Sequence, residues 1–69
     1  MANRNTLYYQ FLKDGSTASE ALERLDYYEE GLRAHLCHED ALDYSEYRCE
    51  GMSSSKAYQT IINDIMRSI

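Results

Sequence analysis

The chain has 69 residues, with 12 acidic side chains against seven lysines and arginines, a net charge of −5, no proline and three glycines. A chain of this length forms at most one domain, which is too small for a two-layer enzyme with a deep cleft. It has no apolar run near the ~20 residues of a membrane span, and residues 1–15 lack the apolar core of a signal peptide. We therefore expect one cytoplasmic domain over residues 1–69 that does not enter a membrane.

The absence of proline and the 3/4 spacing of apolar residues predict an all-α chain, a small compact bundle of three to four helices. A first helix is expected at about 5–14, before Gly15. A second, at about 17–36, opens with a capping box of Thr17 and Glu20. Its apolar stripe is the clearest in the chain and comprises Ala18, Ala21, Leu22, Leu25, Tyr28, Leu32 and Leu36.

A third helix is predicted at about 39–50 and a fourth at about 54–68. The second and third helices are either continuous or broken near 35–40. The fourth helix is expected to bury its apolar residues Ala57, Tyr58, Ile61, Ile62, Ile65 and Met66, with Ile69 as a further candidate. They span about half of the helix circumference, which exceeds the ~100° stripe of an ordinary surface helix. We expect helices two and four to form the core pair. We also expect a homo-oligomer, in which a second copy of the chain covers the apolar surface of the fourth helix that the core does not need.

Acidic residues concentrate in the segment 16–50, which holds ten acids against three arginines. Such a surface repels phosphate backbones, so no direct contact with nucleic acid is expected. A first acidic row, spaced 4, 3 and 4 along the third helix, consists of Glu39, Asp43, Glu46 and Glu50. A second acidic row on the second helix consists of Glu23, Asp26 and Glu30. Three tyrosines lie near these rows: Tyr27, Tyr44 and Tyr47.

Rows of carboxylates with tyrosines between them suit a basic partner protein, because tyrosine is a favoured anchor at interfaces. The alternative is a solvated acidic face with the tyrosines on the rim of the core. Arg48 is expected to point away from the first acidic row. Glu29 and Arg33 are expected to form a helical ion pair.

Metal-competent side chains cluster between residues 35 and 40: His35, Cys37, His38, Glu39 and Asp40, with Cys49 further on. Their spacing matches no zinc motif, and no metal or cofactor is expected. Cys37 and Cys49 are expected to be buried, reduced thiols.

A serine run followed by lysine, Ser53, Ser54, Ser55 and Lys56, comes after Gly51 at the predicted start of the fourth helix. Serines at a helix start are first of all N-caps. The same free N–H groups, hydroxyls and ammonium group would also suit an anion such as a nucleotide phosphate. The run is not a P-loop, because the second glycine of that motif is absent.

These patterns favour a non-catalytic protein-binding regulator or inhibitor. It would dock its acidic, tyrosine-bearing surface on a basic partner such as an enzyme that handles nucleic acid. Its size and charge are typical of phage and mobile-element accessory proteins, which is an analogy of composition. Two alternatives remain at this stage, an oligomer that sequesters an anionic nucleotide at Ser53–Lys56 and a helix-turn-helix regulator. No catalytic residues are predicted, because no histidine, cysteine or carboxylate has an orienting partner in the pattern.

Overall fold

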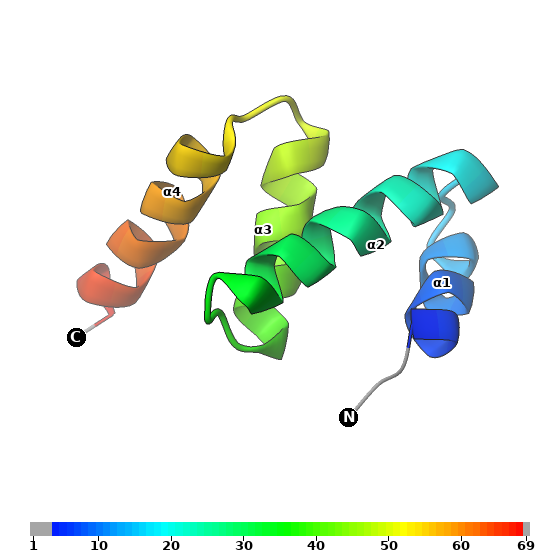
Figure 1. Cartoon of the computed structure of the whole chain (residues 1–69), viewed down its shortest axis with the longest axis horizontal. Coiled ribbons are helices and arrows are strands. Elements are labelled where there is room, and N and C mark those ends of the chain that lie inside the picture. Colours follow the sequence, from blue (N-terminus) through cyan, green and yellow to red (C-terminus); the bar gives the residue numbers. More distant parts are fainter. Residues whose placement is uncertain (1–3, 69) are drawn as a thin grey trace.

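The computed structural model describes residues 4–68, and these form four α-helices and no strand. The helices are α1 (Arg4–Lys13), α2 (Ala18–Arg33), α3 (His38–Cys49) and α4 (Ser54–Arg67). Helix α2 crosses α3 at the centre of the molecule, and α1 and α4 lie on opposite sides of this pair (Figure 1). The predicted all-α bundle is confirmed, and each helix begins and ends within three residues of the expected position.

Helices α1, α2 and α3 end in the same backbone motif. After α2, His35 adopts the left-handed conformation with φ of 70°, and the N–H of Leu36 donates to the carbonyl of Gly31 at 3.1 Å. This is the hydrogen bond of a Schellman motif. The corresponding positions after α1 and α3 are Gly15 and Gly51, with φ of 103° and 104°. The turn at His35 separates α2 from α3. Because a histidine, and not a glycine, occupies the left-handed position, the break is hard to place from sequence.

The helix starts differ in how they are capped. Thr17 and Glu20 form the predicted capping box, in which each side chain accepts the backbone N–H of the other residue. At the start of α4, the hydroxyl of Ser53 accepts the N–H of Lys56 at 3.2 Å. The N-cap of α3 is Cys37, whose side chain makes no capping hydrogen bond. Local sequence therefore specifies where α2 and α4 begin, whereas the start of α3 depends more on packing.

The core is built mainly where α2 packs against α3, so the expected core pair of helices two and four is wrong. A Cβ atom on Gly31 would lie only 3.2 Å from the Cα of Ala41 and 3.3 Å from the ring of Tyr44. These small residues allow the two backbones to approach closely. Of the described residues of α4, only Ala57 and Ile61 are buried. The buried apolar core comprises Leu7, Phe11, Ala21, Leu25, Tyr28, Leu36, Ala41, Tyr44, Ala57 and Ile61.

Some residues predicted to be inside lie at the surface. On α2, the exposed members of the predicted stripe are Ala18, Leu22 and Leu32. Both cysteines are free and exposed, which corrects the expectation that they are buried. Cys37 precedes the first turn of α3, and Cys49 is the last residue of that helix. Ile69 lies outside the described residues.

Candidate protein-binding surface

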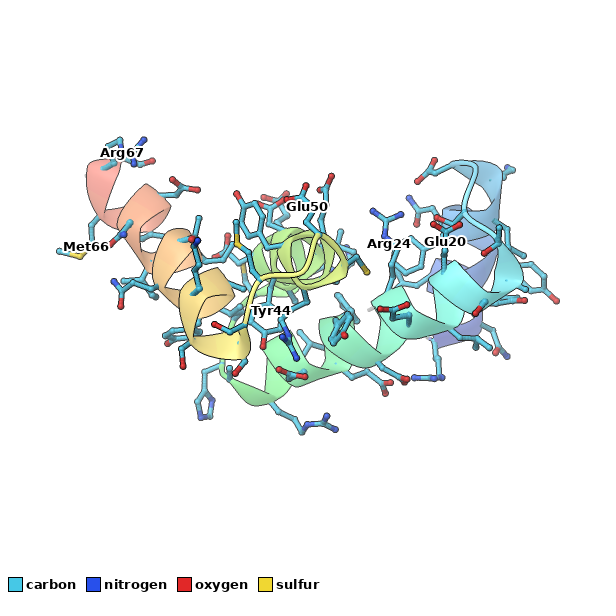
Figure 2. All side chains as sticks on the ribbon, turned by 90° about the horizontal axis from the view of Figure 1, so that it is seen from above. Glu20, Arg24, Tyr44, Glu50, Met66 and Arg67 are labelled. Atoms are coloured by element: carbon cyan, nitrogen blue, oxygen red, sulfur yellow. The ribbon has the colours of Figure 1, made fainter. Side chains whose placement is uncertain are left out.

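The first acidic row lies on one side of α3, as its spacing predicts. All four of its carboxylates are exposed: Glu39, Asp43, Glu46 and Glu50. Figure 2 shows Glu50 on the side of α3 that faces away from α2. Within residues 4–68, no salt bridge joins any of the four to a lysine or arginine. The row is therefore a strip of four carboxylates that form no salt bridge in the described part of the chain.

Helix α4 brings a further carboxylate, Asp64, close to this strip, and Asp64 pairs with Arg67 of the same helix at 3.9 Å. The pKa of the Asp43 carboxyl is raised, first by partial burial and then by neighbouring acids that include Asp64 of α4. The pKa of the Tyr47 hydroxyl is also raised, again first by burial and next by Asp64. We call the first acidic row together with Tyr47 and Asp64 the acidic face. The sequence pattern does not reveal Asp64, because only the packing of α4 on α3 brings it there.

The second acidic row does not form a free surface. Arg4 of α1 pairs with Asp26 at 3.2 Å and also with Glu29. Glu29 thus contacts Arg4, and no salt bridge to its expected partner Arg33 is formed between these described residues. Only Glu23 of the predicted row remains without a salt bridge in the described part of the chain. The proposal that this row binds a partner is therefore not supported at its two other positions.

Glu30, the last residue of the second row, is held by α3. It accepts a hydrogen bond from the hydroxyl of Tyr44 and lies 3.7 Å from the Nε of Arg48. Tyr44 is only 2% exposed, and burial followed by contact with Glu30 raises its pKa to about 12. The prediction of Tyr44 as a surface anchor is wrong, because its ring belongs to the core and its hydroxyl is already bonded.

Arg48 points away from the first acidic row, as expected. Its guanidinium lies 4.7 Å from the centre of the Tyr27 ring and donates to the carbonyl of Met52 at 2.8 Å. Tyr27 is half-buried beneath it. Among the three predicted tyrosine anchors, Tyr47 is therefore the one whose charged neighbours are carboxylates, of which Asp64 pairs with Arg67 at 3.9 Å.

Two shallow hollows extend the acidic face toward α1 and α2. One, of about 160 Å³, lies between α1 and α3, and the other, of about 270 Å³, lies between α2 and α3. Arg24 and Glu46 line both. The Arg24 guanidinium stacks 5.0 Å from the centre of the Phe11 ring and donates to Ser16, and Figure 2 shows it near Glu20. Arg24 is therefore a cation at the edge of the acidic face.

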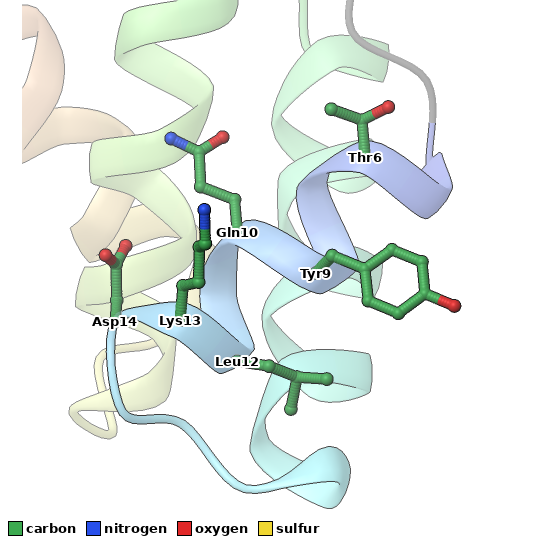
Figure 3. Close-up of a pocket in the computed structure, with 6 residues that line it drawn as sticks. All are labelled: Thr6, Tyr9, Gln10, Leu12, Lys13 and Asp14. Atoms are coloured by element: carbon green, nitrogen blue, oxygen red, sulfur yellow. The ribbon is translucent and has the colours of Figure 1, made fainter.

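A further hollow, over α1, is open surface. It has a volume of about 800 Å³ and is lined by residues of α1 and the turn that follows it. Figure 3 shows that Tyr9 and Leu12 point away from Gln10 and Lys13. Side chains that diverge in this way do not enclose a ligand.

The serine run and the cluster of histidines and cysteines do not form a binding site. Ser53 serves as the N-cap of α4, and Lys56 is exposed beside it. Among residues 4–68, no three histidine, cysteine or acidic side chains are grouped so as to hold a metal ion. The Nδ1 of His38 hydrogen-bonds to the hydroxyl of Tyr28 at 2.8 Å. The pKa of the Cys49 thiol is raised by burial and by Glu23, which disfavours the reactive thiolate.

Comparisons with protein-family models, with characterised proteins and with solved structures find no match to this chain. In the described part of the chain, no helix has the length and apolar character needed to cross a membrane.

Proposed function

We propose that this protein is a non-catalytic regulator that binds a basic partner protein through the acidic face. The observation that supports the proposal is the exposed first acidic row, in which four carboxylates share one helix side without a cationic partner in residues 4–68. Like charges at this spacing cost a helix a few tenths of a kcal/mol per pair. A partner that supplies lysines or arginines would remove this cost.

The charge density of the row supports a partner that normally holds nucleic acid. At a rise of 1.5 Å per residue, the first acidic row from Glu39 to Glu50 spans about 17 Å and presents four carboxylates. A single DNA strand carries about five phosphates over the same axial length. A cationic groove built for phosphates would thus meet a similar density of negative charge on α3. Tyr47, half-buried within the face, would supply apolar contact area with little loss of entropy.

The setting that we propose is the cytoplasm. Free, exposed thiols such as Cys37 and Cys49 remain reduced there. The negative face would also accelerate the encounter with a basic partner by electrostatic steering, which weakens as salt increases.

The experiment compares two pairs of substitutions that remove the same charge. Asp43→Asn with Glu46→Gln neutralises the centre of the acidic face. Asp26→Asn with Glu29→Gln neutralises carboxylates that are paired with Arg4 on another part of the surface. A partner is isolated with the wild-type chain from cells that express it, and its affinity for each purified variant is then measured at several salt concentrations.

We expect the acidic-face pair to weaken binding at least about tenfold and to flatten the salt dependence. The control pair should bind within about twofold of the wild type, which is under 0.5 kcal/mol. Equal affinity of all three chains, or binding that strengthens with salt, would exclude the acidic face as the docking surface. Circular dichroism of each variant verifies that it is folded.

A further inference from the structure

Helix α4 has a second apolar side that the fold leaves uncovered. Ala57 and Ile61 face α3 and are buried. A neighbouring side carries what we call the α4 seam: Tyr58, Ile62, Ile65 and Met66. Tyr58 and Ile65 are 38% and 39% exposed, and Met66 is 68% exposed. Figure 2 shows Met66 pointing away from α3. The α4 seam therefore lies at the outer edge of the molecule.

The spacing and charge of the α4 seam favour pairing with another helix of the same kind. Tyr58, Ile62 and Ile65 are spaced 4 and 3, which is the alternation of a coiled-coil seam. No charged residue belongs to it, since the charged residues of α4 project from other sides of the helix at 100° per residue. These are Lys56, Asp64 and Arg67. Two chains that each carry a charge of −5 can therefore meet here without opposing carboxylates.

A hollow beside the seam provides space for one of its own side chains. It has a volume of about 460 Å³ and lies between the start of α4, the C-terminal end of α2 and α3. Ala34 and Tyr58 line it together with the polar residues Glu30, Tyr44, Ser54 and Ser55, and Glu30 is already hydrogen-bonded to Tyr44. In an antiparallel pair of α4 helices centred on Ile62, Met66 of one copy lies opposite Tyr58 of the other, because each is four residues from the centre. Methionine is unbranched and adapts to irregular gaps. Its side chain can thus enter the hollow reciprocally in both copies.

We propose that the α4 seam binds the α4 seam of a second copy of this chain in an antiparallel homodimer, with Met66 seated beside the second copy's Tyr58. Four side chains and the rim of one hollow cover less than the ~800 Å² per partner of a standard interface. The dimer is accordingly weak and forms at high micromolar concentration. Asp64, the member of the acidic face that belongs to α4, projects from another side of this helix than the α4 seam, so the dimer leaves the acidic face of each copy uncovered. This inference does not depend on the proposed function.

Sedimentation equilibrium of the full chain, from about 10 µM to about 1 mM, tests the proposal. The average mass is expected to rise from 8.1 kDa toward twice that value. Met66→Glu places a carboxylate in the seam of both copies and should keep the chain monomeric throughout. Tyr9→Glu is the matched control, because Tyr9 is 66% exposed on α1, and it should associate like the wild type.

Salt gives a second criterion that separates this association from partner docking. Raising the salt concentration screens the repulsion between two acidic chains, so dimer formation should strengthen, whereas binding to a basic protein should weaken. A mass that stays at 8.1 kDa up to the highest concentration would overturn the proposal. The proposal would also be overturned if the Met66→Glu variant associated as strongly as the wild type. It would equally be overturned if the Tyr9→Glu variant failed to associate.

Discussion

The two acidic rows look alike in the sequence but differ in the folded chain. In the second row, on α2, Asp26 is paired with Arg4, and Glu30 lies against Tyr44 and Arg48. The first row, on α3, forms no salt bridge within the described residues, and Arg24 lies at its edge. Helical spacing determines which carboxylates share a side, and the packing of other helices determines whether that side stays negative. Of the two rows, the first is the one that forms no salt bridge within residues 4–68.

The largest expected effect comes from removing Arg48, which compensates the second row. Arg48→Met removes its hydrogen bond to the Met52 carbonyl, its contact with Tyr27 and the positive charge near Glu30. We expect unfolding by urea to show a loss of about 2 kcal/mol in stability. Arg33→Met is the control, because Arg33 is an exposed arginine of α2. The free energy of unfolding of this variant should lie within about 0.5 kcal/mol of the wild-type value. If both variants lost the same free energy of unfolding, the contacts of Arg48 with Glu30 and Tyr27 would not contribute to the stability of the chain.

A smaller effect of opposite sign is expected in the first row. Asp43→Asn removes a carboxylate that neighbouring acids disfavour, and should stabilise the chain at pH 7 by about 0.5 kcal/mol. Because the folded-state pKa of Asp43 is raised, its ionised form destabilises the fold. The gain should therefore fade as the pH falls through that raised pKa, where the wild-type carboxyl is protonated.

Asp26→Asn is the matched control for this change, because it removes a carboxylate that is paired with Arg4. It should leave the stability unchanged or slightly lower. Thermal unfolding of both variants between pH 7 and pH 3 compares them directly. Stabilisation by Asp26→Asn, or destabilisation by Asp43→Asn at pH 7, would remove the contrast between the two rows.

The smallest effect is expected for Arg4→Ala. Its ion pairs with Asp26 and Glu29 join exposed side chains, and such pairs contribute about 0.5 kcal/mol. The loss in stability should disappear at about 1 M salt, where the Debye length is about 3 Å. A loss that persists at high salt would indicate that Arg4 stabilises α1 by packing and not by charge.

Much of the fold can be predicted from local patterns. The capping box at Thr17 and the glycines at 15 and 51 mark helix boundaries, because these residues supply the hydrogen bonds or the positive φ that a helix end needs. Between α2 and α3 the sequence leaves two alternatives, a continuous helix or a break near 35–40, since a histidine takes the position usually held by glycine; the structure has the break. The core pair escapes prediction, because α3 contributes Ala41 and Tyr44 where the pattern favours the more apolar α4.

The candidate site is predictable only where it lies within one helix. The first acidic row follows from its spacing on α3. Asp64 of α4 lies near the first row, and Arg4 of α1 pairs with the second row. Neither position can be predicted from the periodicity of a single helix. Tyr44 and Tyr47 are three residues apart, and the crossing with α2 buries Tyr44 while Tyr47 stays half-buried.

The close approach of Gly31 to Ala41 has a kinetic consequence. These residues are ten positions apart, so the central contact of the molecule closes a short loop, and folds with such local contacts form within microseconds to milliseconds. The hairpin of α2 and α3 can then act as the folding nucleus on which the outer helices dock. Because α4 buries only Ala57 and Ile61 among its described residues, it can detach in local opening events while the hairpin persists.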